Sequence, residues 1–435
     1  MNIKKVGDSS AENPRFGGFY KWEVLFLLWG AFFINQADRQ IYNTLIGDIS
    51  ASLSLTSAEA GFIATMFGWI MAVLCPFAGI LADRYSKQGS IVFSIALWSV
   101  ATIVSGSCAG LVGFLIFRSA ATGVGESFFG PANYATIGEY HDTRTRARAM
   151  SIHQTSYYLG VVASGAIAGY VAERWGWRCA FYSFGSVGVR GGVLLMLRLR
   201  DKPRTAPSPR AGNAPAPKNP PLLDSLKIIF KVKTALCLIL GFSGLIFVLQ
   251  GYLTWSTLYL QEKFDGISRA DAGFSSMFYT HIAALAGVVI AGWISDKLAA
   301  KRRAYRILLQ SAGLLAAAPF IIMMGMSDTM AAVYCGFAGF GFFRAFFDAN
   351  TYSVLYDVIP KKFHASAAGL MIAIGFGIGS FSPWILGHLK PLLGLSVGIS
   401  SLSVVWILLS VLMFIAFKFF YESDCQAADK INSQQ

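Results

Sequence analysis

An acidic and a basic side chain stand next to each other inside a long apolar stretch near the N-terminus. The stretch begins at Trp22, and Asp38 and Arg39 lie within it. Charged side chains are costly to bury in a membrane-spanning segment, and they usually face a water-filled pathway, a partner charge or a coupled ion. The pair therefore predicts an ion-coupling transport site, provided that the chain spans a membrane.

The composition indicates that it does. Hydrophobic residues make up 55% of the 435-residue chain and charged residues only 14%, whereas a soluble domain carries about 25% charged residues. About twelve apolar segments approach the ~20 residues that cross ~30 Å of hydrocarbon. We expect an all-α integral membrane protein whose spans begin near residues 22, 59, 90, 111, 148, 179, 234, 271, 304, 329, 364 and 394.

Lysine and arginine are concentrated in alternate loops. The basic loops contain Arg84 and Lys87; Arg144, Arg146 and Arg148; residues 198–233; residues 297–306; and Lys361 and Lys362. Basic loops stay in the cytoplasm, so we expect a plasma (inner) membrane protein with both termini cytoplasmic. Because the charge follows the loops, the net charge of +13 does not indicate a nucleic-acid partner. The expected partners are a small-molecule substrate, protons and membrane lipids.

A Pro-rich polar segment, residues 201–221, divides the chain in the middle. Such a composition buries too little apolar surface to fold. The stretch that follows is basic and amphipathic, which is typical of a helix on the membrane surface. We expect an N-terminal segment at 1–21, a six-helix bundle at 22–200, a linker at 201–233, a second six-helix bundle at 234–421 and a tail at 422–435.

The two halves contain the same short motif, Gly-x-x-x-Asp-basic, at the ends of the second and eighth predicted spans. Glycine permits close approach between helices, and the aspartate can accept hydrogen bonds from the N-terminus of a neighbouring helix. We expect these contacts to latch one conformation at the cytoplasmic surface and to release in another. The gating candidates are Gly79, Asp83, Arg84, Gly292, Asp296 and Lys297.

Six spans, a linker, six more spans and the repeated motif resemble the major facilitator superfamily over nearly the whole chain. This resemblance implies two pseudo-symmetric six-helix bundles around a central cavity that opens alternately to each side of the membrane.

Two spans narrow the resemblance. The first reads Asn35-Gln-Ala-Asp38-Arg39, and the fourth reads Arg118-Ser-Ala-Ala-Thr-Gly123-Val-Gly125-Glu126. Both resemble the anion:cation symporters, which include sugar-acid and sialin-like organic-anion carriers, and also the Spinster-type lipid carriers. The resemblance implies proton coupling at Asp38 and Glu126. A structural ion pair at Asp38, or a helix–helix contact at Glu126, is the alternative.

One spacing departs from that pattern. Arg118 lies five residues before Gly123, where the families usually have four. In a regular α-helix, Arg118 and Glu126 would then lie ~80° apart around the axis. The role of Arg118 is therefore left open.

The substrate-binding candidates are basic or polar side chains within apolar segments. Arg39 could bind an anion or position a helix, and Arg344 could bind an anion or be neutralised by Asp348, four residues on. We interpret His281 first as a buried core histidine. The other candidates, each of which could instead form a helix–helix hydrogen bond, are Tyr134, Gln154, Tyr157, Gln250, Tyr279 and Asn350.

Enzyme chemistry is not indicated. The chain has no Gly-rich phosphate-binding loop followed by Lys and Ser or Thr, and its six cysteines have neither metal-ligand nor redox spacing. We therefore expect no cofactor and no metal, and energy drawn from an ion gradient or from the substrate's own gradient.

The resulting hypothesis is a monomeric, proton-coupled symporter of a small organic anion, such as a sugar acid. A carboxylate at Asp38 or Glu126 takes up a proton, and the anion binds at Arg39 and at Arg344. Three alternatives remain open: a Spinster-like carrier of an amphipathic lipid, an uncoupled facilitator or exchanger, and a membrane receptor that does not transport.

Overall fold

The computed structural model describes residues 19–84, 86–142, 145–201 and 222–433. Within these ranges the regular elements are helices, and no strand occurs. Residues 1–18 of the expected N-terminal segment and most of the Pro-rich linker lie outside the described residues. The surroundings of Gly79 and the side chains of Asp83 and Arg84 are likewise not described.

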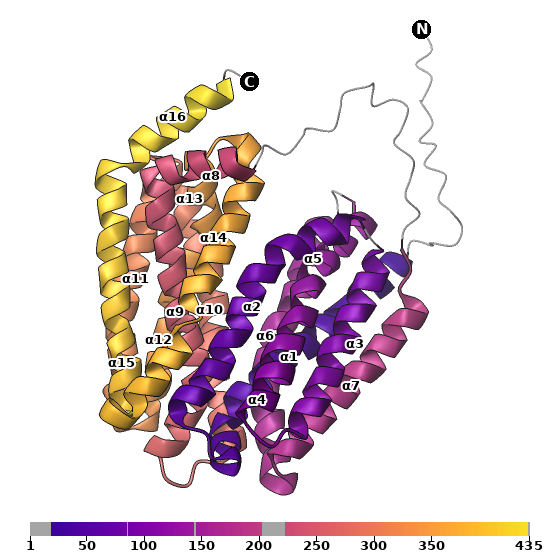
Figure 1. Ribbon diagram of the computed structural model, residues 1–435. Coiled ribbons are helices and arrows are strands. Elements are labelled where there is room, and N and C mark those ends of the chain that lie inside the picture. The colour runs from indigo at the N-terminus through magenta and orange to yellow at the C-terminus, as the bar shows by residue number, and fades with distance from the viewer. Residues whose placement is uncertain (1–18, 85, 143–144, 202–221, 434–435) are drawn as a thin grey trace.

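Six membrane passes precede the linker and form one bundle, the right-hand one in Figure 1. Three helical segments in a row form the fourth pass, and each of the other passes is a single helix. The helices are α1 (Tyr20–Leu53), α2 (Ser57–Arg84), α3 (Lys87–Gly106), α4 (Leu111–Phe114), a π-helix (Leu115–Ala121), α5 (Thr122–Tyr140), α6 (Arg146–Trp175) and α7 (Trp177–Arg198).

Six passes follow the linker and form the second bundle. Their helices are α9 (Lys233–Lys263), α10 (Arg269–Ala299), α11 (Tyr305–Met326), α12 (Met330–Asp348), α13 (Thr351–Val358), a 3-10 turn (Lys361–Phe363), α14 (His364–Gly379) and α15 (Ser382–Phe419). The helix α15 turns at Gly394, where φ is 73°, so its first part ends the eleventh pass and its second part is the twelfth. The expected two-bundle fold is confirmed, and most passes begin within two or three residues of the predicted starts.

Two short amphipathic helices, α8 (Leu222–Lys231) and α16 (Tyr421–Ser433), lie at the end of the molecule where Arg198 and Lys233 also lie. We call this end the linker face. The other end, where α1, α9 and α11 finish and α15 turns, is the opposite face (Figure 1).

Some of the membrane passes are less apolar than the others. In the described residues, eight helical stretches are long and apolar enough to cross a membrane, and the last of them contains both passes of Lys361–Phe419. The remaining passes are α1, the fourth pass and α6. Two of these three, α1 and the fourth pass, contain buried charged side chains. Ionisable side chains lower the mean hydropathy of a span, which explains why these passes are less apolar.

Glycines bring the two bundles into backbone contact toward the opposite face. Gly165 of α6 lies against Gly273 of α10, and Gly61 of α2 lies against Pro383 of α15. A Cβ atom at any of these glycines would collide with backbone of the other bundle. Small residues at helix crossings allow this approach in a membrane. The described ion pairs and hydrogen bonds between the bundles lie in the middle of the molecule or toward the same face.

Candidate functional site

Four charged side chains of the N-terminal bundle form two ion pairs inside the membrane region. Arg118 Nη1 lies 3.3 Å from Asp38 Oδ2, and Arg39 Nε donates to Glu126 Oε2. The side chains of Asp38 and Glu126 are 2% and 0% exposed, whereas that of Arg39 is 25% exposed. Arg39 is therefore the member of the cluster that remains accessible to a ligand.

Backbone and ring contacts hold both arginines in place. Arg118 Nη2 donates to the carbonyl oxygens of Asp38 at 3.2 Å and Arg39 at 2.9 Å. Both guanidinium groups lie over the ring of Phe67, at 5.5 Å for Arg39 and 5.7 Å for Arg118, a position favoured by the ring quadrupole. The sulfur atom of Met71 lies 2.9 Å from Arg39 Nη2. Neither Phe67 nor Met71 is distinguishable in sequence from lipid-facing apolar residues.

The π-helix explains how Arg118 joins this cluster. The backbone N–H of Thr122 bonds to the carbonyl oxygen of Phe117, five residues earlier, so this turn holds one residue more than an α-helical turn. The eight residues from Arg118 to Glu126 then turn through about as much angle as seven α-helical residues, which leaves the two side chains ~20° apart. The five-residue spacing before Gly123 is thus absorbed locally, and both residues reach α1.

A second group of polar side chains lies in the C-terminal bundle. Arg344 Nη1 lies 3.6 Å from Asp348 Oδ2, the predicted pairing four residues apart. His281 is buried, and its Nδ1 donates to the carbonyl oxygen of Met277 at 2.7 Å. Arg344 Nε and His281 Nε2 are buried without a hydrogen-bond partner in the described part of the chain. These are two unsatisfied nitrogens in one region, a situation that buried polar groups usually avoid.

Tyr157 of α6 connects the two groups. Its ring lies 6.0 Å from that of His281, and the hydroxyl group is within electrostatic range of Arg39, Arg344 and Asp348. A side chain of the N-terminal bundle thus stands between the ion pairs of its own half and the polar residues of the other half. Tyr158, which the sequence did not single out, also contacts the His281 ring, at 6.2 Å.

The remaining substrate-binding candidates occupy varied positions. Tyr134 is 40% exposed and Gln154 is exposed, while Gln250 is half-buried. Tyr279 stacks on Tyr334 with ring centroids 4.5 Å apart.

Asn350 is buried and is bonded to one neighbouring helix and to its own segment. It accepts a hydrogen bond from Ser295 Oγ and donates to the carbonyl oxygen of Phe346. The bond with Ser295 of α10 is a helix–helix hydrogen bond of the kind stated as the alternative for Asn350.

The C-terminal copy of the glycine–aspartate motif is open in this conformation. A Cβ atom at Gly292 would meet nothing within 4 Å, and Asp296 and Lys297 are exposed. Lys297 Nζ lies 5.1 Å from the ring centroid of Trp293 on the same helix. No described ion pair involves Asp296.

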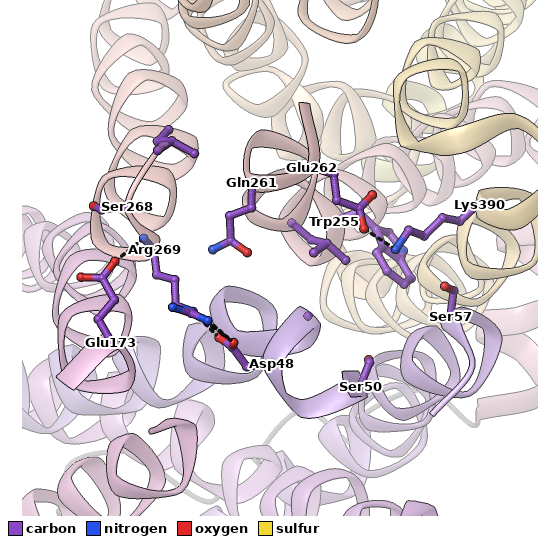
Figure 2. Close-up of a pocket in the computed structure, with 13 residues that line it drawn as sticks. Asp48, Ser50, Ser57, Glu173, Trp255, Gln261, Glu262, Ser268, Arg269 and Lys390 are labelled. Atoms are coloured by element: carbon purple, nitrogen blue, oxygen red, sulfur yellow. Dashed lines mark hydrogen bonds and ion pairs between the residues drawn. The ribbon is translucent and has the colours of Figure 1, made fainter. Parts of the chain in front are cut away.

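A polar pocket lies between the bundles at the opposite face (Figure 2). Its volume is about 450 Å³. Arg269 of α10 pairs with Asp48 of α1 at 2.7 Å, and the backbone N–H of Arg269 donates to Glu173 of α6. A second pair, Lys390 with Glu262 at 2.6 Å, lies within the C-terminal bundle. Asp48 follows Asp38 by ten residues, about 15 Å along a helix, so the pocket is separate from the charge cluster.

Two six-helix bundles, related as repeats and carrying polar side chains where they meet, define a membrane carrier. The chain belongs to the Major Facilitator Superfamily, whose family model matches residues 28–383. It is therefore a multi-pass membrane protein of a transporter family.

The similar transporters share only about a quarter of their aligned residues with this chain. The chain is 26% identical over 400 residues to "Probable anion transporter 4, chloroplastic" of Oryza sativa subsp. japonica, covering 88% of this chain and 66% of that protein. It is 25% identical over 394 residues to the D-galactonate transporter of Escherichia coli O6:H1, covering 86% and 90%. A bacterial homologue of the human lysosomal transporter Spinster, solved in an inward-facing and occupied conformation, matches with a TM-score of 0.80 and 19% identity over 93% of this chain and 98% of that one.

Proposed function

We propose that this protein is a proton-coupled symporter of a small organic anion, a sugar acid or a related carboxylate, working by alternating access. The observation that carries the proposal is the Arg39–Glu126 pair. Glu126 Oε2 is bonded to Arg39, while Glu126 Oε1 is buried without a partner among the described residues. A proton on Oε1 would release Arg39, the accessible arginine, for an anionic ligand.

The proposed cycle starts with an empty carrier in which the carboxylates neutralise the arginines. Protonation at Glu126 or Asp38 frees a positive charge, and the anion replaces the lost carboxylate charge at Arg39. The loaded site is then neutral again, which lowers the cost of closing it away from water. A monoanion moving with one proton is electroneutral, so the pH gradient supplies about 1.4 kcal/mol per pH unit.

The substrate class rests on two observations. Two arginines, Arg39 and Arg344, lie within electrostatic range of Tyr157, and Arg344 Nε has no hydrogen-bond partner in the part of the chain described. An arginine fork suits the planar carboxylate group. The relatives named for anions and for D-galactonate support a carboxylate-bearing substrate.

Alternation requires that the two faces open in turn. We propose that the Asp48–Arg269 pair and the glycine contacts hold the opposite face closed in the present conformation. The exposed Asp296 motif would dock only when the linker face closes. The Asp83 motif, whose side chains lie outside the described part of the structure, would act in the same way in the first half.

Uptake into proteoliposomes under an imposed inward proton gradient tests the function, with substrate-dependent acidification as the second readout. A thermal-shift screen of sugar acids, sialic acid, dicarboxylates and lysolipids would first identify a ligand. Uptake that ignores the gradient would indicate a facilitator or exchanger. Competition by lysolipid would indicate a lipid carrier, and ligand binding without flux would indicate a receptor.

A further inference from the structure

One arginine of α7 is exposed on the surface of the N-terminal bundle, within a membrane pass. Arg190 is exposed and lies eight residues before Arg198, which places its Cα about 12 Å below the linker-face end of the helix. Its neighbours on the same surface are apolar, and Val187 and Leu194 are 50% and 51% exposed. No described side chain forms a hydrogen bond or an ion pair with Arg190.

Such a position is costly unless the charge finds a partner. An arginine facing hydrocarbon is expensive, and its side chain extends toward the headgroup region to reduce the cost. Arg198 already has a partner, because its Nε lies 3.0 Å from Glu23 Oε1. Arg190 is therefore the uncompensated positive charge on this surface of the described structure.

An apolar groove lies between α1 and α7. Arg190 does not line it, but the next residue of α7, Gly191, lines its inner part. Two hollows form it, and both are lined by Phe26, Leu27 and Leu194. The inner hollow, about 130 Å³, reaches down to Trp98 of α3. The outer hollow, about 660 Å³, opens at the linker face, where the paired side chains of Glu23 and Arg198 also line it. The groove thus leads from the headgroup level into the hydrocarbon region.

A glycine keeps the floor of the groove open. Gly30 of α1 lines the inner hollow, and a Cβ atom there would meet nothing within 4 Å. Trp22 lines the outer hollow, at the depth where tryptophan usually marks the membrane–water interface. The shape therefore matches a lipid chain below a polar headgroup.

We propose that this groove binds an anionic glycerophospholipid, with one acyl chain between α1 and α7 and the phosphate region drawn toward Arg190. Charge complementarity selects this occupant, because anionic headgroups attract membrane-proximal Arg and Lys. A zwitterionic lipid would bring a compensating positive charge and gain less. The site lies on the outside of the N-terminal bundle, so it is independent of the proposed transport path.

Native mass spectrometry of the purified full chain tests the proposal, with phosphatidylglycerol and phosphatidylcholine of identical acyl chains as probes. Two variants address the two halves of the site. Arg190→Gln removes the charge, and Gly30→Leu fills the groove at a helical position that has free space. Lys418→Gln is the matched control, since Lys418 is exposed near the linker-face end of α15, away from the groove.

The natural sequence should carry bound phosphatidylglycerol about fivefold more often than phosphatidylcholine, which corresponds to about 1 kcal/mol for one basic residue near an anionic surface. Arg190→Gln should abolish this preference, Gly30→Leu should lower occupancy by both lipids, and Lys418→Gln should change neither. An unchanged preference in Arg190→Gln, or full occupancy in Gly30→Leu, would overturn the proposed site.

Discussion

Glu126 Oε2 accepts a hydrogen bond from Arg39 Nε, while Oε1 of the same carboxylate is buried and unpartnered among the described residues. Asp38, the neighbour of Arg39, is in turn held by Arg118 at 3.3 Å. The two acids therefore differ: one is bonded by the accessible arginine, and the other by a buried arginine that also binds backbone carbonyls. Glu126 is therefore the acid whose bond directly occupies the accessible arginine, whereas Asp38 is bonded to the arginine that organises the cluster.

Glu126→Gln should abolish uphill uptake driven by a pH gradient. An amide keeps the size of the side chain but cannot take up and release a proton. Exchange of substrate for substrate should persist, because it needs no empty carrier to return. Uptake under an inward proton gradient, run beside counterflow, measures both. The equivalent substitution Asp38→Asn should impair both assays, because it weakens the hold on Arg118.

The matched control is Glu139→Gln. Glu139 lies on the same helix but pairs with Lys87 at the linker face, so gradient-driven uptake should remain. Full accumulation by both Glu126→Gln and Asp38→Asn would sink the coupling assignment, and His281 and Asp348 would become the next residues to substitute.

The spans and the first charge pair could be predicted from sequence because bilayer thickness fixes the length of a span. The cost of burying charge likewise makes Asp38 and Arg39 conspicuous. The Arg344–Asp348 pair could also be predicted, since residues four apart lie on one face of a helix. These inferences need only local sequence.

Contacts between distant segments could not be predicted in this way. The pairing of Asp48 with Arg269 joins residues 221 positions apart, and nothing in either local sequence indicates the partner. Arg118 shows a different limit. The sequence predicts the direction of the Arg118 side chain only for a regular α-helix. The π-helix at Leu115–Ala121 places Arg118 on a different face of the pass.

Arg39→Lys should weaken anion binding more than it alters the pH dependence of transport. Lysine keeps the charge but lacks the planar fork that matches a carboxylate. Loss of one hydrogen bond to a charged group costs ~1.5–3 kcal/mol, so we expect affinity to fall about tenfold to a hundredfold. Binding measured by thermal shift or calorimetry, beside the pH profile of uptake, separates the two effects. A shifted pH profile with unchanged affinity would contradict the assigned role.

Asp48→Asn should loosen the opposite face. Arg269 and Asp48 are 44% and 22% exposed, and a pair this exposed contributes at most ~1 kcal/mol, so the open population should rise up to about fivefold. The labelling rate of a cysteine placed at Gln261, in a background without native cysteines, reports this opening.

Glu262→Gln is its matched control. It breaks the Lys390 pair in the same pocket, but both partners belong to the C-terminal bundle. Its labelling rate should equal that of the unsubstituted background. Equal acceleration by both variants would show local loosening of the pocket rather than separation of the bundles.

The linker face should be cytoplasmic, because the basic loops lie there. A cysteine at Ser423 of α16 should resist an impermeant reagent added to intact cells, and a cysteine at Asp328 of the opposite face should react. Both positions are exposed. Ser208, in the linker, is a further position for the same assay and lies outside the described residues. The reverse labelling pattern would refute the orientation.

Deletion of one residue within the π-helix should be tolerated, whereas deletion of one residue from α5 should not. The π-helix already contains one residue more than an α-helix needs, so removing Ala121 should restore regular helix and keep Arg118 and Glu126 on one face. Removing Ala132, which is fully buried in α5, should rotate the rest of the pass by ~100° relative to Glu126 and expose its packing surface. Thermal unfolding of the two purified deletion variants, followed by gradient-driven uptake, makes the comparison. If both deletions destabilise the protein to the same extent, the π-helix does not hold a dispensable extra residue. That result would contradict the explanation of how Arg118 reaches Asp38.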